Sequence, residues 1–219
     1  MLEATLRIDF ISTWHVGSGL GGGHLSDAIL ARDHDGLPVL PGRAVKGALR
    51  EGAWRLALCR PDLTAAEIYF WGGRSLGTDS NQPGRLAVSA AELPSELRRE
   101  LRFHPVLERE AFVRDMTCLQ AQTALTQRRT VVAHSLRVLE CGIPGMRFEA
   151  MLRVAAPDVD SGWLQAYFRA VCAATKSVGA HRARGLGACR IRLGGHDGAV
   201  SLPPPCPSEI TATPQGAIA

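Results

Sequence analysis

The chain lacks any long apolar run, although 46% of its 219 residues are hydrophobic. No stretch approaches the roughly 18 consecutive apolar residues that a membrane-spanning helix needs, so the pattern indicates no membrane partner. The first ten residues, MLEATLRIDF, alternate in polarity and carry an acid early. A secretory signal instead has a basic start and a long apolar centre. We therefore expect a cytoplasmic protein with one folded core.

Closely spaced cysteine pairs are also lacking. The six cysteines are Cys59, Cys118, Cys141, Cys172, Cys189 and Cys206. They form no CxxC pair, and no histidine pair accompanies them at the spacing of a zinc site. Cysteine commonly behaves as a small buried hydrophobe, so we expect reduced, mostly buried thiols and no metal-binding set.

A large excess of one charge is also lacking. The chain has 25 Lys and Arg residues and 21 Asp and Glu residues, for a net charge of +4. A nucleic-acid site would therefore depend on local clustering of basic side chains. The length favours one domain with elaborations, which we place at residues 1–196. Residues 197–219 include a proline cluster, Pro203, Pro204, Pro205 and Pro207, and are expected to form an extended tail.

Polarity patterns predict six elements of the core. Strands are expected over 5–12, 84–90, 146–155 and 188–193, and helices over 43–60 and 162–176. This order is that of the α+β ferredoxin-like, split βαβ fold, which RNA-recognition domains also use. Segment 92–145, between the second and third strands, is too long for a turn, and we expect a thumb-like insertion that projects from the core.

A glycine-rich loop follows the first predicted strand. Residues 17–22, GSGLGG, match the GxGxxG pattern of dinucleotide-binding loops. Such a loop must open a helix that receives the phosphates, whereas residues 24–41 look extended and rich in turns. Residues 42–49, GRAVKGAL, lack the Ser or Thr that follows the lysine of a Walker motif. Neither segment therefore indicates a nucleotide site.

Basic side chains gather at the start of the first predicted helix. Arg43, Lys46 and Arg50 lie at i, i+3 and i+7 and share one helical face. They follow Pro41 and Gly42, where exposed backbone N–H groups at a helix start favour phosphate. An alternative is the ordinary solvated face of an amphipathic helix.

A second basic segment is the loop 179–187, GAHRARGLG. His181, Arg182 and Arg184 lie among glycines, which permit close approach of a backbone or ligand. We expect these three side chains to bind RNA, with a plain loop that enters a strand as the alternative.

Several motifs in order resemble one known family. They are His15-Val16-Gly17, Asp27, Arg32-Asp33, the Pro38–Gly42 turn, Lys46-Gly47-Ala48-Leu49-Arg50 and the glycine loop 179–187. A weaker match is TALTQRRT at 123–130, similar to the segment before a projecting thumb, with a return strand at 144–149. Together they resemble the RAMP-superfamily backbone subunits of type III CRISPR effector complexes, of the Csm and Cmr kinds.

The resemblance implies a subunit that binds CRISPR guide RNA, stacks on copies of itself in a filament and joins other type III subunits in antiviral defence. Its thumb would lie between segments of the duplex of guide and complementary target RNA, with Arg128 and Arg129 near the thumb base as further RNA-binding residues. In catalytic members, the residue that matches Asp27 supports endoribonuclease cleavage of target RNA with Mg²⁺ or another divalent cation. The ribose 2′-hydroxyl attacks the adjacent phosphate, and no organic cofactor is involved.

Other interpretations of these residues stay open. The chain is a non-catalytic RNA-binding scaffold or a capping subunit if Asp27 is only a turn residue. A more distant alternative is a guide-processing endonuclease with His15 as general base. His15 and His24 could also assist the reaction at Asp27. We interpret residues 33–36, DHDG, as a turn and not as a metal cluster, because Asp and Gly favour turns for backbone reasons.

Overall fold

The computed structural model describes residues 1–23, 26–73, 83–124, 126–194 and 200–210. His24 and parts of the expected tail, 197–199 and 211–219, lie outside the described residues. Of the described helices, none is long and apolar enough to cross a membrane.

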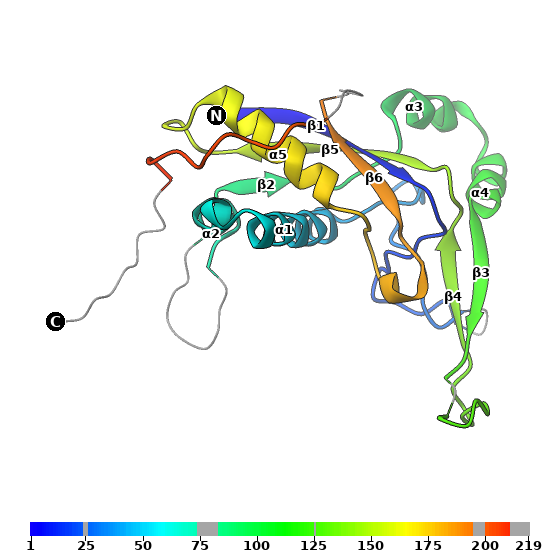
Figure 1. Cartoon of the computed structure of the whole chain (residues 1–219). Coiled ribbons are helices and arrows are strands. Elements are labelled where there is room, and N and C mark those ends of the chain that lie inside the picture. Colours follow the sequence, from blue (N-terminus) through cyan, green and yellow to red (C-terminus); the bar gives the residue numbers. More distant parts are fainter. Residues whose placement is uncertain (24–25, 74–82, 125, 195–199, 211–219) are drawn as a thin grey trace.

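A four-stranded antiparallel sheet forms the centre of the protein (Figure 1). Its strands are β1 (Leu2–Phe10), β2 (Leu86–Val88), β5 (Arg147–Val154) and β6 (Cys189–Leu193), in the spatial order β2-β5-β1-β6. The register runs from Leu2↔Val154 to Asp9↔Arg147 between β1 and β5. Because β1 and β2 flank β5, while β5 and β6 flank β1, two strand–helix–strand units interleave. The predicted α+β class is confirmed.

Two helices cover one face of this sheet. They are α1 (Gly42–Cys59) and α5 (Ser161–Ala174), which pack against each other. Alternate strand residues such as Leu6, Ile8 and Phe148 are fully buried on the helix side, as expected for a sheet with one covered face. The remaining residues of the same strands point to the opposite, open face.

The six predicted core elements all exist, with ends shifted by a few residues. The largest shift is at β1, which begins at Leu2 because the alternation of buried residues extends to the start of the chain. The sequence analysis missed α2 (Thr64–Trp71), which follows a short 3₁₀ turn, η1 (Pro61–Leu63). Five of the eight residues of α2 are buried, so the helix shows no clear amphipathic period.

The insertion 92–145 contains two helices and a hairpin. The helices α3 (Ser95–Phe103) and α4 (Val106–Asp115) pack on the core through Leu101 and Val113, which are buried. The strands β3 (Thr117–Gln122) and β4 (Arg137–Gly142) pair in register from Thr117↔Gly142 to Gln122↔Arg137. Among the described elements of the insertion, this hairpin projects from the body of the molecule (Figure 1), and we call residues 117–142 the thumb.

The described part of the expected tail, 200–210, is extended but not loose. The indole Nε1 of Trp163 in α5 donates to the carbonyls of Pro204 (3.2 Å) and Pro205 (3.1 Å). Ile210 is buried in the main core. Residues 200–210 therefore pack against the folded domain through Trp163 and Ile210.

All six cysteines are unpaired thiols. Cys141, Cys172 and Cys189 are buried, and burial raises their pKa values to about 11, 12 and 12. Cys118 and Cys206 are half-buried and Cys59 is exposed. Half of the thiols are thus buried, and their reduced state stays a prediction.

Candidate nucleic-acid interface

The glycine loop 179–187 lies against the segment that follows β1. The Ala180 N–H donates to the His15 carbonyl (2.9 Å), and a Cβ at Gly179 would lie 2.4 Å from the same oxygen. Gly179 has φ +103° and His181 has φ +55°, so the loop depends on left-handed backbone that glycine adopts without strain. A 3₁₀ turn, η2 (Arg182–Arg184), forms its centre and presents the basic side chains.

His15 connects this loop to the thumb. Its ring is buried, and Nδ1 donates to the Glu140 carbonyl of β4 (2.7 Å). A carbonyl only accepts, so the hydrogen of neutral His15 lies on Nδ1. The rings of His15 and His181 are 6.3 Å apart. The pKa of His181 is lowered by burial first and then by the charges of Arg184 and His15. His15 therefore holds the segment after β1 to β4 of the thumb.

A first groove separates α1 from the glycine loop, with a volume of about 490 Å³. We call it the helix groove; its lining residues are Val16, Gly17, Arg43, Ala44, Gly47, Ala48, Glu51, Gly179, Ala180 and Arg182. Most are small, so a ligand backbone can approach closely. Arg182 pairs with Glu51 across the groove, and this hydrogen bond holds the pKa of Glu51 below its ordinary value. Arg43 is exposed at the rim.

Two of the three predicted basic residues of α1 point elsewhere. The Lys46 Nζ donates to the Leu86 carbonyl of β2 (2.9 Å), and the Arg50 Nη2 donates to the Gly72 carbonyl after α2 (2.9 Å). Both side chains therefore hold α1 to its neighbours. The helix groove instead faces positions 43, 47 and 51, which lie four residues apart on one stripe of the helix.

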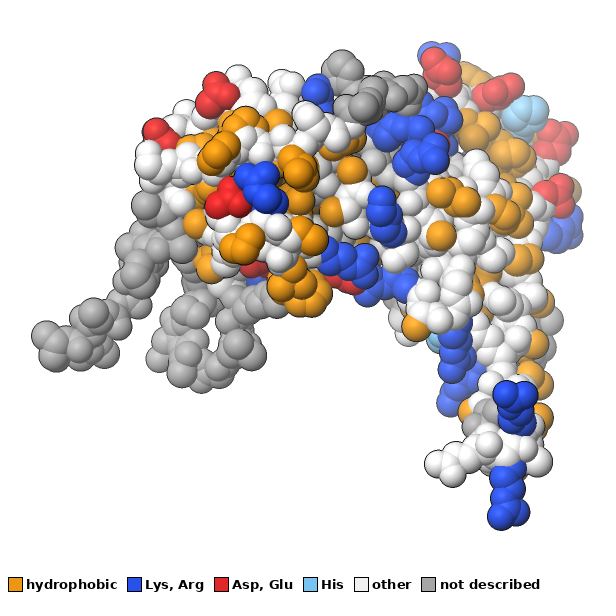
Figure 2. Space-filling model, viewed as in Figure 1, with side chains coloured by type: hydrophobic (Ala, Val, Ile, Leu, Met, Phe, Trp, Pro, Cys, Tyr) orange, Lys and Arg blue, Asp and Glu red, His pale blue; other side chains and the backbone are white. Residues whose placement is uncertain are grey.

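A second groove, of about 390 Å³, lies on the other side of η2, against the thumb. We call it the thumb groove; its lining residues are Gln122, Thr123, Ala124, Val132, Ala133, His134, Ser135, Arg137, His181 and Arg184. Arg184 Nη1 donates to the Gln122 Oε1 at the end of β3 (2.7 Å). Figure 2 shows Lys and Arg side chains along the lower edge of the molecule and down the projecting hairpin. His181, Arg182 and Arg184 thus connect two adjacent grooves.

The sequence analysis missed His134 and Arg137 of the thumb groove. No element was assigned inside 92–145, so nothing placed these residues near the glycine loop. The alternating burial of RVLECG at 137–142 was the available signal of a strand.

Arg128 and Arg129 lie at the tip of the thumb and not near its base. They are exposed in the loop between β3 and β4. The Thr126 N–H donates to the Thr130 carbonyl (2.8 Å), and the Arg129 N–H donates to the Thr126 carbonyl (2.9 Å), with φ +61° at Arg129. This closed turn lies next to Ala124 and Val132 of the thumb groove, but Arg128 and Arg129 are not among the residues that line either groove.

Asp27 lies along the outer edge of the thumb. Its N–H donates to the Val138 carbonyl, and its Oδ2 accepts from the Val138 N–H, both at 2.7 Å. The next residue, Ala28, forms a parallel bridge with Leu139. Asp27 is exposed, and its partner Val138 on β4 is the residue that follows Arg137 of the thumb groove. The Asp27 carboxylate therefore has one oxygen in a structural bond and the other outside it.

Glu140 of β4 binds the segment that follows Asp27. Its Oε2 accepts from the Leu30 N–H (2.9 Å), and its Oε1 pairs with Arg32. The chain between Asp27 and Arg32 therefore follows β4, which explains how a motif close to the first strand reaches the thumb.

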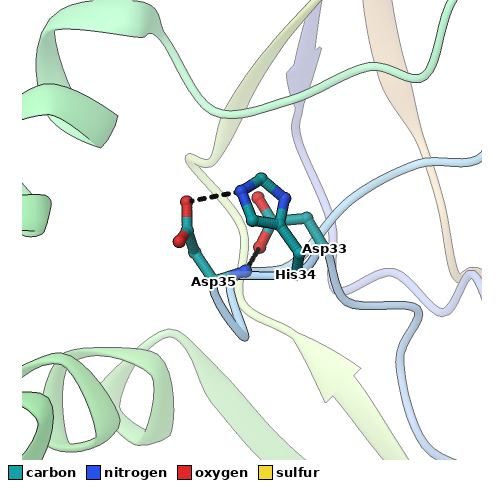
Figure 3. Close-up of side chains that lie close together, drawn as sticks. All are labelled: Asp33, His34 and Asp35. Atoms are coloured by element: carbon teal, nitrogen blue, oxygen red, sulfur yellow. Dashed lines mark hydrogen bonds and ion pairs between the residues drawn. The ribbon is translucent and has the colours of Figure 1, made fainter.

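Asp33, His34 and Asp35 have potential ligand atoms within 4.8 Å of one another (Figure 3). Asp33 Oδ1, however, accepts from the N–H groups of Asp35 (2.9 Å) and Leu37 (3.0 Å). Arg98 of α3 pairs with Asp33 (3.2 Å), and Arg102 pairs with Asp35 (3.4 Å). These contacts support a turn held by arginines, as expected from the sequence, since both carboxylates already have cationic partners.

Asp27 belongs to no comparable group within the described part of the chain. Mg²⁺ often uses one or two carboxylates, several waters and the phosphates of its substrate. Asp27 fits the role of a single protein ligand of that kind, because its exposed carboxylate still has one oxygen outside the bond to Val138.

No curated protein matches the chain. Chains in cryo-EM structures of a type III-B Cmr-beta complex, in the apo state and bound to cognate target RNA, are similar with TM-scores of 0.63 and 0.61. Each is 12% identical, and each match covers 88% of this chain and 97% of the other, which shows a shared fold. The RAMP-superfamily model matches residues 7–190, and the chain therefore belongs to the RAMP superfamily.

Proposed function

We propose that this chain is a guide-RNA-binding backbone subunit of a type III CRISPR effector complex. The observation that carries the proposal is the loop 179–187, which places arginines between the helix groove and the thumb groove. The interleaved strands support a ferredoxin-like core with a thumb. The likeness to chains of the Cmr-beta complex supports association with other type III subunits.

The helix groove suits the sugar–phosphate backbone of RNA. Arg43 and Arg182 supply positive charge, and Gly17, Gly47 and Gly179 leave room for close approach. The first turn of α1 adds backbone N–H groups that favour a phosphate. Such contacts position a strand without reading its sequence, as a protein that accepts many guides requires.

Target RNA would then pass the thumb groove and Asp27. A divalent cation there would stabilise charge on the reacting phosphate. The chain's own part is to orient the strand: Val138 fixes the Asp27 carboxylate, while Arg137 and Arg184 hold adjacent phosphates. Alignment of a 2′-hydroxyl with its neighbouring phosphate is the main contribution expected from this site.

A non-catalytic scaffold is the second candidate. The hydrogen bond from the Val138 N–H to Asp27 Oδ2 favours this scaffold role, because it gives the Asp27 carboxylate a structural function that does not depend on catalysis.

Two substitutions separate these functions. Asp27→Asn keeps an acceptor for the Val138 N–H and removes the charge, whereas Asp27→Ala removes both. If Asp27 is catalytic, both variants lose cleavage of complementary RNA by at least about a hundredfold, while binding persists. The assay uses the co-expressed, guide-loaded complex with Mg²⁺ and measures binding in parallel. Cleavage retained in Asp27→Asn contradicts the catalytic role, and a complex that purifies without RNA contradicts the whole proposal.

The helix groove has its own test. Replacing Arg43 and Arg182 by Gln removes two phosphate contacts, so the slope of log affinity against log salt should fall by about 1.4. Arg99→Gln, an exposed arginine of α3, is the matched control. An unchanged slope in the double variant counts against RNA in this groove.

A further inference from the structure

The open face of the central sheet carries a second concentration of arginines, away from both grooves. Outward-facing residues of β1, β5 and β6 include Arg7, Arg147, Arg153, Arg190 and Arg192, against Glu3, Asp9 and Glu149. Apart from these and Thr5, the outward residues of the four strands are Ala87 and Met151. In Figure 2, Lys and Arg side chains gather over the region of β1 and β6.

Asp9 organises this cluster. Arg147 Nε bonds to Asp9 Oδ1 (2.7 Å), Arg192 Nη1 bonds to Oδ2 (2.9 Å), and Arg7 Nε lies 3.2 Å from Oδ2. The strand register explains the convergence, because Asp9 stands opposite Arg147 on β5 and opposite Arg190 on β6. A single carboxylate thus fixes three arginines from three strands.

The cluster keeps an excess of positive charge. Glu149 stands opposite Arg7, so among the described outward residues of the strands the arginines 7, 147, 190 and 192 lie with two carboxylates, Asp9 and Glu149. Arg190 is exposed and has no ion-pair partner among the described residues. The Arg147 side chain is 45% exposed and bonds Asp9 through Nε. Its terminal nitrogens remain as outward donors in the planar fork that suits a phosphate.

We propose that this face, which we call the arginine face, binds the phosphate backbone of single-stranded RNA independently of sequence. It is distinct from the helix groove, which lies beside α1. Stacking of RNA bases on side chains does not drive this binding, since none of the outward residues of the four strands is aromatic. An acidic protein partner is less suited, because interface cores are rich in aromatic and apolar side chains. Asp9 is a positioning residue that holds the arginines in place.

The test measures binding of a fluorescein-labelled oligouridine of 20 nucleotides to the purified full chain over a range of salt concentrations. Replacing Arg147 and Arg190 by Gln should weaken binding by about tenfold at low salt and lower the salt slope by about 1.4. Arg99→Gln, an exposed arginine of α3 that lies outside the four strands, is the control and should change neither. Unchanged binding in the double variant, with the fold intact by circular dichroism, overturns the proposal.

Two further arms separate this surface from its alternatives. In a variant with Arg43 and Arg182 replaced by Gln, addition of the two arginine-face substitutions should weaken binding again; no further loss overturns the arginine face and leaves the helix groove standing. Polyglutamate at matched charge should compete poorly with oligouridine, and equal competition would assign the face to an acidic protein instead. Asp9→Asn should weaken binding although it removes negative charge, and tighter binding would contradict the positioning role.

Discussion

Individual basic side chains in this protein differ in role even within two turns of one helix. Lys46 and Arg50 donate to carbonyls of β2 and of the residue after α2, whereas Arg43 faces the helix groove. Spacing predicts which residues share a helical face, but it does not say what lies opposite that face. The RNA-binding role of Lys46 and Arg50 stays a prediction, and their present partners indicate that their loss would also loosen α1.

A pH dependence follows from Asp9. Its burial raises the pKa, but the hydrogen bond from Arg147 and the charges of Arg7 and Arg147 outweigh this and leave the pKa below its ordinary value, which is about 3.9. A depressed pKa stabilises the folded state above the ordinary value, and this contribution is lost as the pH falls through the folded value. The melting temperature should therefore be higher for the wild type than for Asp9→Asn near neutral pH. The difference should shrink below about pH 4, as thermal unfolding followed by circular dichroism would show; a constant difference across the range contradicts this account.

At the scale of elements, the close contact of α1 and α5 depends on one glycine. A Cβ at Gly52 would lie 2.1 Å from the Thr175 Oγ1 and 2.9 Å from the Val171 carbonyl oxygen. Gly47, in the same helix, has no such neighbour within 4 Å. Helix packing therefore requires glycine at position 52 but not at position 47, although both residues lie in the interior of the same helix.

This difference predicts opposite effects on stability. Gly52→Ala should lower the free energy of unfolding by about 1–3 kcal/mol, because the two helices must separate. Gly47→Ala, as the matched variant, should raise it by roughly 0.5–1 kcal/mol through helix propensity. Urea unfolding measures both, and a stabilising Gly52→Ala would show that the helices pack less closely than described.

The helices and strands inside the insertion were not predicted from the sequence pattern. Leu97 and Leu101 carried a helical spacing for α3, but charged residues surround them. The strands of the thumb are short and half exposed, so their alternation is weak. A projecting insertion was expected from its length and its partly charged composition, and among its described elements the hairpin projects.

Across the whole molecule, residues 200–210 join elements that are distant in sequence. Arg60, after α1, donates to the Pro203 carbonyl (3.4 Å), and Trp163 of α5 holds the next two carbonyls. Proline-rich composition predicted an extended tail. It did not predict the docking, because the partners are Arg60 and Trp163.

Removal of residues 200–219 should therefore destabilise the protein by about 2 kcal/mol or more, since Ile210 leaves the core. Trp163→Phe keeps an aromatic ring beside Tyr167 and loses only the indole donor, for a cost of about 1 kcal/mol. Differential scanning calorimetry of both variants checks this order. A truncated chain as stable as the full one would show that the segment contributes nothing to folding.

Local sequence was sufficient for the six core elements, for the glycine loop and for the motifs that identify the family, because strand alternation, helical spacing and glycine conformations depend on neighbouring residues. Tertiary structure alone decided which arginines meet. Asp27 reaches β4 across more than one hundred residues, Arg184 reaches Gln122, and three strands bring their arginines to Asp9. These contacts depend on strand order and register, which are set by burial of the whole core and not by any one segment.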